Sequence, residues 1–361
     1  MDSSMRAGSA AGHAARRRTL AQLFRAVATA TVASVALNAC GGGGGSVAAP
    51  ESPPPPAPTP VPAPSPAPTG PIAAQMTVPT PVGYDADRLA AFNRLNEIRL
   101  SAGLGMLAQS AAMDQAAQAH AQWMVANDSF THEETAGTTG FTGASWPLRD
   151  EAFGYVPVGG SEVIAGSGHA EAEVDALIGG VYHRAGLLAF GPVDVGIGRA
   201  SASAPHVSTP LVIDLTRPGT DAIRGMGQAA QALIQGAAIW PLDNALGVPR
   251  ELGLESPNPI PGQDVLSLGM PVSVTVGESK TISAVTFTLT DGSTGLSVPV
   301  HLLTNQNDPN FLVPGSFIAI IPLVVLAPGT TYYASFSGSS VEFVSGGVEA
   351  ISRDWSFTTS P

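Results

Sequence analysis

The chain has 361 residues, of which 44% are apolar and 12% are charged, with 41 glycines, 32 prolines, one cysteine and one lysine. This length suggests two modest domains with accessory segments. From residue 40 onward there are 11 basic and 27 acidic residues, a net charge of −16 that would repel phosphate backbones and argues against nucleic-acid binding. A single cysteine excludes an internal disulfide and any cysteine-based zinc or iron–sulfur site.

Residues 1–39 have the pattern of an export signal. Basic residues at 16–18 and 25 precede the uncharged stretch 26–37, which is too short to span a bilayer as a helix. Cys40 follows three residues after the end of this stretch, directly after the small residue Ala39. This segment resembles a bacterial lipoprotein signal, in which the cysteine is acylated and becomes the new N-terminus; the alternative is an ordinary signal peptide with an unrelated cysteine.

The lipoprotein resemblance implies a location. Gly41, rather than an aspartate, follows Cys40, and in such lipoproteins this implies sorting to the outer membrane. We therefore expect a cell-envelope protein that faces the periplasm or the cell surface, with lipidated Cys40 as its membrane partner.

Residues 40–79 form a Gly/Pro-rich linker. Twelve of the 22 residues from 50 to 71 are proline. Such a segment adopts extended polyproline II at about 3.1 Å per residue, which predicts a stalk of about 70 Å between the lipid and the folded part.

Helical periodicity opens the first folded domain, residues 80–239. Leu89, Phe92, Leu95 and Ile98 predict a helix over 87–102, and Ser110 is a suitable cap for a second helix that runs to about residue 127. His120 lies on the apolar face of that second helix, where we interpret it as a core histidine with satisfied hydrogen bonds.

Strand-like segments follow at 162–165, 193–199 and 209–216, with a helical stretch at 170–181. The order of helices and strands fits parallel winding poorly. It favours a three-layer arrangement with a short antiparallel sheet between helices.

Three residues of this domain have side chains suited to chemistry: His132, Glu162 and His183. Two imidazoles and a carboxylate can bind a divalent metal, relay protons or hold loops together through hydrogen bonds. Their spacing alone does not establish that they converge.

Short motifs around these residues resemble the bacterial CAP domain, of the superfamily named for cysteine-rich secretory proteins, antigen five and pathogenesis-related proteins. The resemblance covers about 150 residues, and its strength lies in the order and spacing of the motifs: Leu95-Asn96-Glu97-Ile98-Arg99, Ala116-Ala117-Gln118-Ala119-His120-Ala121, Phe130-Thr131-His132, Gly160-Ser161-Glu162-Val163-Ile164-Ala165, His183-Arg184-Ala185-Gly186-Leu187-Leu188 and Val195-Gly196-Ile197-Gly198. It implies an α–β–α sandwich with His132, Glu162 and His183 facing one cleft.

The chain departs from the family pattern at the second acid of this cleft. Members usually carry it three residues after a tryptophan on the helix before the second histidine, but here these positions hold Leu177 and Gly180. The sequence offers four substitutes: Glu133, Glu134, Glu173 and Asp175.

Three interpretations of the cleft stay open. His132, Glu162 and His183 could hold zinc or another divalent metal, could form a hydrolytic site with a histidine as general base, or could be a structural hydrogen-bond network in a binding protein. No residue has the sequence context of a nucleophile, and no Gly-x-Ser-x-Gly motif occurs. Binding is therefore favoured over catalysis.

Residues 240–361 have the pattern of an all-β domain. Strand candidates alternate with turn signals at Asp291-Gly292 and Pro328-Gly329, which argues for a β-sandwich. The segments 326–333 and 355–359 resemble a bacterial immunoglobulin-like domain. Its only histidine is His301, and no chemistry is indicated for it. The strand candidates are 272–276, 285–289, 296–303, 316–321, 332–337 and 355–359.

The sequence thus predicts an α+β protein in which a CAP-like sandwich precedes an immunoglobulin-like sandwich. The expected function is extracytoplasmic binding of a small apolar ligand, such as a lipid or sterol-like molecule, or of a cell-envelope partner. The alternative is a metal-dependent or general-base hydrolase in the same cleft.

Overall fold

The computed structural model describes residues 74–361, apart from 167, 203–204, 220–230, 234–235 and 254. The described residues all belong to one compact unit, Pro66–Pro361. The predicted signal, Cys40 and the proline-rich part of the linker lie outside the described residues. Within the described part of the chain, no helix combines the length and the apolar character that a membrane span requires.

The first two helices begin within one residue of the positions that the sequence indicates, whereas the helix Trp146–Ala152 was not predicted. The Asp85 carboxylate accepts a hydrogen bond from the Arg88 N–H, and the Ser110 hydroxyl accepts one from the Met113 N–H, which satisfies free N–H groups in each first turn. The predicted helical stretch 170–181 is divided in two because Gly180 has an extended backbone. The helices are α1 (Ala86–Ser101), α2 (Ala111–Asn127), α3 (Trp146–Ala152), α4 (Ala170–Gly179) and α5 (Val181–Leu187).

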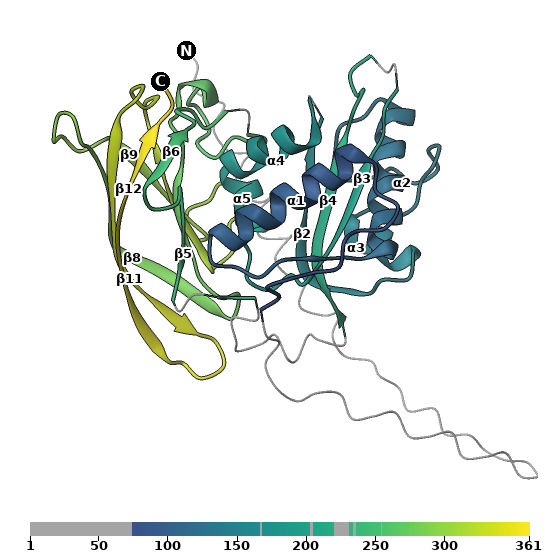
Figure 1. Ribbon diagram of the computed structural model, residues 1–361, viewed down its shortest axis with the longest axis horizontal. Helices are drawn as coiled ribbons and strands as arrows, with labels where there is room; N and C mark the ends of the chain where they lie inside the picture. Colours follow the sequence, from purple (N-terminus) through teal and green to yellow (C-terminus); the bar gives the residue numbers. More distant parts are fainter. Residues whose placement is uncertain (1–73, 167, 203–204, 220–230, 234–235, 254) are drawn as a thin grey trace, which may run out of the picture. The chain divides into compact units, whose positions relative to one another are not determined.

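A four-stranded sheet lies between these helices, in the order β1-β3-β4-β2 (Figure 1). The β3–β4 and β2–β4 pairs are antiparallel, whereas the short β1 is parallel to β3. Its strands are β1 (Ala108–Gln109), β2 (Pro157–Ala165), β3 (Asp194–Arg199) and β4 (Leu211–Pro218).

Alternation along the strands divides the core into two layers. Val163 packs with residues of α1 and α4, whereas its neighbour Ile164 packs with residues of α2 on the other face. The predicted α–β–α sandwich is therefore confirmed. Because β2 is an edge strand, one of its long sides has no partner strand in this sheet.

The second part is a sandwich of two four-stranded sheets, β5-β7-β10-β9 and β6-β12-β11-β8. Their inner faces share one core, to which the first sheet contributes Val274 and Ile320 and the second contributes Phe336 and Phe357. The predicted α+β class, with an all-β region at the C-terminal end, is confirmed. The strands are β5 (Ala238–Trp240), β6 (Ala245–Val248), β7 (Val272–Thr275), β8 (Lys280–Asp291), β9 (Val300–Thr304), β10 (Phe317–Pro322), β11 (Thr331–Glu342) and β12 (Val348–Thr359), with a short 3₁₀ helix η2 (Val265–Ser267).

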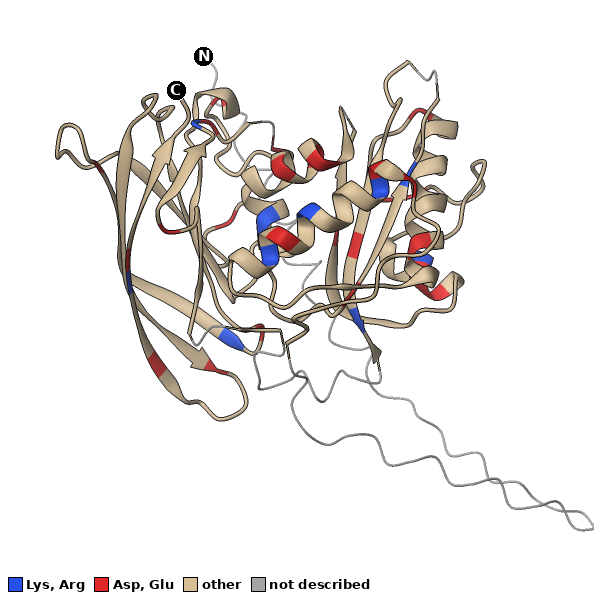
Figure 2. Cartoon of the chain, in the orientation of Figure 1, with Lys and Arg blue, Asp and Glu red and all other residues tan. Residues whose placement is uncertain are grey.

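Helix α5 joins the two parts. Val181 and Ala185 pack in one apolar cluster with Leu268, Phe317 and other residues of the all-β part. Charged residues are sparse in both parts (Figure 2), but polar contacts also join them, among them Arg217–Glu278 and Tyr182–Asp308.

Candidate functional site

A cavity of about 480 Å³ lies beside the edge strand β2. His132, Glu162 and His183 all line it, so the structure brings the three predicted residues to one cavity. Residues of the all-β part complete its wall, among them Pro257, Glu278, Leu312 and Phe343. The cavity therefore belongs to both parts of the chain rather than to the CAP-like part alone.

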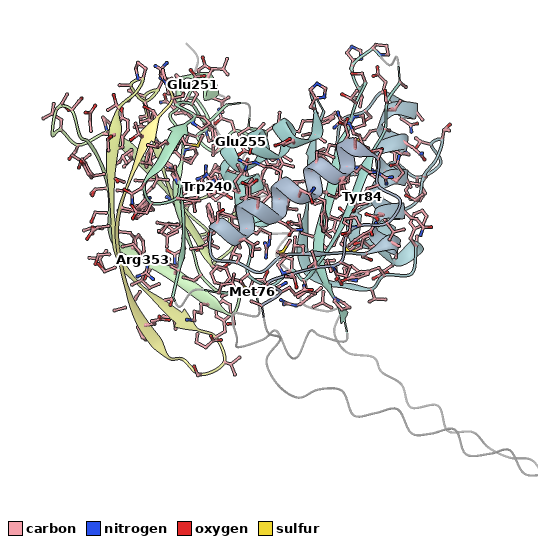
Figure 3. All side chains as sticks on the ribbon, viewed as in Figure 1. Met76, Tyr84, Trp240, Glu251, Glu255 and Arg353 are labelled. Atoms are coloured by element: carbon pink, nitrogen blue, oxygen red, sulfur yellow. The ribbon has the colours of Figure 1, made fainter. Side chains whose placement is uncertain are left out.

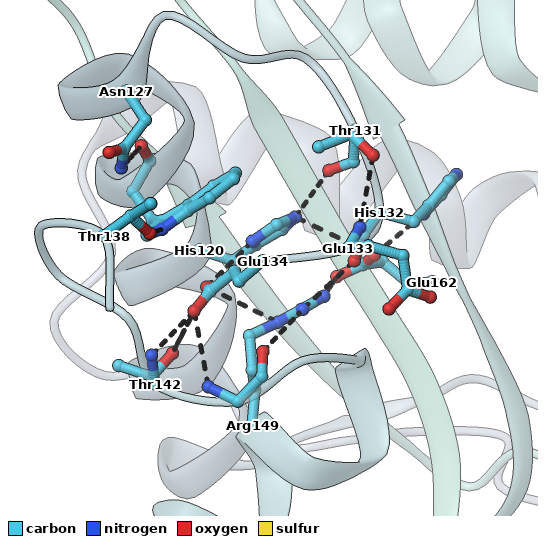
Figure 4. A network of polar contacts seen from close by, with 12 residues as sticks. His120, Asn127, Thr131, His132, Glu133, Glu134, Thr138, Thr142, Arg149 and Glu162 are labelled. Carbon is cyan, nitrogen blue, oxygen red and sulfur yellow. Dashed lines mark hydrogen bonds and ion pairs between the residues drawn. The ribbon is translucent and has the colours of Figure 1, made fainter. Parts of the chain in front are cut away.

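His132 and Glu162 form a pair at the mouth of this cavity. His132 Nδ1 lies 2.8 Å from Glu162 Oε1, and the imidazole is 48% exposed while the carboxylate is fully buried. The Arg149 guanidinium, from α3, donates from Nη2 to Glu162 Oε2 at 2.5 Å (Figure 4). Burial raises the pKa of Glu162, but the hydrogen bond from His132 and the charge of Arg149 outweigh it and hold that pKa below its ordinary value.

His120 lies behind this pair and is fully buried. Its Nδ1 is 3.0 Å from Glu134 Oε1 and its Nε2 is 2.9 Å from the Thr131 carbonyl oxygen (Figure 4). Burial lowers the pKa of His120. Its interpretation as a core histidine with satisfied hydrogen bonds is confirmed.

Two buried carboxyl groups near Glu162, those of Asp214 and Asp150, were not predicted from the sequence as part of the site. Asp214, on β4, is directly opposite Glu162 in the β2–β4 register, and Asp150 is on α3; both are fully buried. No N–H or hydroxyl group of the described residues donates to their four oxygens. Burial, reinforced by the negative charge of Glu162, raises the pKa of Asp150 to about 7 and that of Asp214 well above its ordinary value. The sequence signal that could have identified Asp214 is its position between the apolar residues Ile213 and Leu215 of a predicted strand.

His183 has a different carboxylate partner from His132. Its Nδ1 lies 2.8 Å from Oε1 of Glu255, which is in the segment between β6 and η2 (Figure 3). Glu255 Oε2 also accepts a hydrogen bond from the Tyr182 N–H. A side chain at Gly180 would place its Cβ within 3 Å of both Glu255 Oε2 and His183 Nδ1. The glycine at the family's acid position therefore leaves the space that Glu255 fills.

The four substitutes proposed from the sequence do not pair with His132 or His183. Glu134 contacts His120, Glu173 bonds to Arg199, and Asp175 bonds to Arg94, while Glu133 is exposed. The acid comes instead from the domain for which no chemistry was expected, which corrects that expectation. Glu255 follows His183 by 72 residues, and nothing in the intervening sequence indicates the contact.

The neighbour of His183 in the chain fixes α5 to the all-β part. Arg184 is fully buried and donates to the carbonyl oxygens of Ile178 and Pro271 and to the Ser273 hydroxyl. Burial lowers the pKa of Arg184 to about 9, although the negative charge of Glu255 opposes this shift. The position of His183 therefore depends on contacts outside the CAP-like part.

The residues predicted as metal ligands do not fit a metal centre in this arrangement. Each histidine directs Nδ1 to a different carboxylate, and the guanidinium of Arg149 already bonds to Glu162. Among residues 74–361 that the structure describes, no group of three or more His, Cys, Asp or Glu side chains could hold a metal ion. The zinc site stays a prediction without structural support, and no chemistry is assigned to it.

Comparison with known proteins agrees with this fold. Residues 92–204 match the family model described as the cysteine-rich secretory protein family, CAP. The chain therefore contains a CAP domain, and the matched residues include His132, Glu162 and His183 but not Asp214 or Glu255. A comparison with curated proteins found no match.

Two solved structures show limited similarity to the chain. An outer surface protein from Borrelia burgdorferi is 17% identical, with a TM-score of 0.32, over 36% of this chain and 92% of that one. An extracellular protein containing an SCP domain from Bacillus anthracis str. Ames is 19% identical, with a TM-score of 0.30, over 35% of this chain and 39% of that one.

Proposed function

We propose that this chain is an extracytoplasmic CAP-domain lipoprotein that binds a small, largely apolar ligand in the cavity beside β2. One observation carries the proposal: the cavity joins the His132–Glu162 pair and His183 to an apolar wall from the all-β part, which includes Leu312 and Phe343. Pockets with apolar walls and a few convergent polar groups are typical of small-molecule sites. A cell-envelope partner that inserts an apolar side chain would use the same surface.

The location of the protein is proposed from its first 41 residues. The basic and uncharged segments before Cys40 support export, and the cysteine supports anchoring by acylation. Gly41 supports the outer membrane as the destination. The proline-rich linker would then hold the binding cavity away from the lipid surface.

Binding to the cavity is tested with the neutral apolar dye N-phenyl-1-naphthylamine. The full chain should enhance the fluorescence of the dye saturably, at one site per chain. Phe343→Ser should weaken dye binding about fivefold, because it removes part of the apolar wall. Phe343 is 65% exposed, so the substitution should leave the fold intact.

Phe311→Ser is the matched control for this experiment. Phe311 is 88% exposed but does not line the cavity, so its loss should leave dye binding unchanged. Dye binding that is not saturable, or that falls equally in both variants, would contradict the proposed site.

A general-base hydrolase is the second candidate, and the His132–Glu162 pair favours it. A carboxylate that holds an imidazole at Nδ1 leaves Nε2 available to accept a proton from water. The two candidates differ in turnover: a hydrolase should cleave p-nitrophenyl acetate catalytically and lose that activity in His132→Gln, whereas a binding protein should show no turnover above that of His132→Gln.

A further inference from the structure

The polar groups that face the cavity are mainly hydrogen-bond acceptors. Glu278 accepts a hydrogen bond from Arg217 at Oε2, and no described residue donates to its Oε1. The hydroxyl of Ser161, which also lines the cavity, has no hydrogen-bond partner among the described residues. The Ser161 hydroxyl oxygen is buried beneath the cavity wall, so the cavity offers the free carboxylate oxygen of Glu278 to an incoming ligand.

The two histidines add acceptors of the same kind. The hydrogen bond of 2.8 Å between His132 Nδ1 and Glu162 Oε1 places the proton of a neutral His132 imidazole on Nδ1, whereas His183 Nδ1 lies 2.8 Å from Glu255 Oε1 without the geometry of a hydrogen bond. Nε2 of His132 then carries the lone pair, and neither His132 nor His183 has a hydrogen bond at Nε2 within the described part of the chain. Both rings line the cavity, so each can accept a hydrogen bond from a ligand.

Cationic side chains near the cavity bond to residues of its wall but do not line it themselves. No lysine or arginine is among the described residues that line the cavity. The Arg149 guanidinium is fully buried and bonds to Glu162 and to the His132 carbonyl oxygen. A ligand with a carboxylate or phosphate group would therefore meet acceptors and carboxylates without a guanidinium or ammonium partner.

We infer that the cavity selects a ligand with a primary ammonium head and an apolar body, an inference that rests on the proposed function and names its ligand class. An ammonium supplies three donors and a positive charge, which match the acceptors on His132, His183 and Glu278. The apolar body would contact Leu312 and Phe343.

Competition against bound N-phenyl-1-naphthylamine tests the head group. Octylamine, octanol and octanoate share one apolar chain and differ only in charge and donors. At pH 8, where the alkylamine is positively charged, octylamine should displace the dye at a concentration at least tenfold below that needed with octanoate. Octanol should be intermediate, because its hydroxyl donates one hydrogen bond without charge.

The variants Glu255→Gln and Glu251→Gln test whether the negative charge of Glu255 contributes to octylamine binding. Both glutamates precede η2, but only Glu255 is buried against His183, whereas Glu251 is exposed (Figure 3). Loss of the carboxylate charge in Glu255→Gln should weaken octylamine on the order of tenfold and leave octanol unchanged. Glu251→Gln should bind all three compounds as the unmodified chain does.

The outcomes distinguish the two proposals. If neither the dye nor any octyl compound binds, the proposed function fails. If the dye binds but octanoate or octanol displaces it as well as octylamine does, the proposed function stands and the ammonium inference is overturned. The inference is also overturned if the preference for octylamine is the same in Glu255→Gln and Glu251→Gln.

Discussion

Glu162 connects two environments of opposite character. On the cavity side it holds His132 in a defined orientation, and on the buried side it bonds to Arg149 and faces Asp214 across the sheet. A buried carboxylate keeps its charge only when hydrogen bonds and cations compensate for lost hydration. Glu162 receives this compensation from His132 and Arg149, whereas the pKa values of its buried neighbours Asp150 and Asp214 are raised.

The raised pKa of Asp150 predicts how stability depends on pH. Below its ordinary pKa of 3.8 the aspartic acid is largely protonated in both states, whereas between 3.8 and about 7 the unfolded chain is the state that releases the proton. Stability should therefore fall as pH rises through this range, by up to about 1.4 kcal/mol per pH unit, and level off above it. Asp150→Asn should raise the melting temperature by several degrees at pH 8 and little at pH 4.

Thermal unfolding of the variant and the unmodified chain at both pH values measures this effect. Asp354→Asn is the control, because Asp354 is exposed on β12 and its substitution should change neither value. Equal effects of Asp150→Asn at pH 4 and pH 8, or a loss of stability at pH 8, would show that the pKa of Asp150 is not raised in the folded protein.

At the scale of elements, α5 is held from both sides. Its apolar face packs into the cluster with Leu268 and Phe317, and Arg184 donates to the Ile178 carbonyl oxygen at the C-terminal end of α4 and to the Pro271 carbonyl oxygen before β7. A buried guanidinium that serves several carbonyl oxygens leaves them all without a donor when it is removed. The helix that carries His183 is therefore fixed by both parts of the chain.

Arg184→Met should destabilise the protein by about 2–4 kcal/mol in urea unfolding and should also weaken dye binding, because His183 would lose its fixed position. Arg94→Met is the matched control. Arg94 forms exposed ion pairs with Glu97 and Asp175, whose loss should change stability by less than about 1 kcal/mol. Stability of Arg184→Met equal to that of Arg94→Met would show that the buried contacts do not hold α5.

At the scale of the whole molecule, the predicted anchor and the cavity lie far apart in the sequence. Cys40 precedes the first described residue by 34 positions, and the proline-rich linker lies between. In the proposed arrangement, membrane attachment depends on Cys40 and ligand binding depends on the cavity. A substitution that affects one of them should therefore leave the other unchanged.

Cys40→Ser should move the protein from the membrane fraction to the soluble fraction, because the acylated residue is lost, while dye binding is retained. Fractionation of cells and immunodetection of the chain measure this. Gly41→Asp is the companion variant, which should stay in the membrane fraction but move from the outer to the inner membrane. Cys40→Ser protein that still sediments with the membrane would refute lipidation.

The sequence was sufficient for most of the longer elements, although it missed α3, β1 and β6, and the family resemblance supplied three residues of the cavity. Periodicity located α1 and α2, alternation located most strands, and the motifs around His132, Glu162 and His183 placed them in one cleft. These features are local, because a helix or strand is specified by the spacing of its own apolar residues. The boundary between α4 and α5 was missed because Gly180 ends one helix and precedes the next without a gap.

The partners of those residues were decided only by the tertiary structure. Asp214 meets Glu162 through the β2–β4 register, and Glu255 reaches His183 from the all-β part. Such contacts join residues that are distant in the chain, so no local pattern encodes them. The net charge of −16 from residue 40 onward argued only against nucleic acid as a partner. The packing of two sandwiches around α5 determined which carboxylates are buried, which are paired, and which face the cavity.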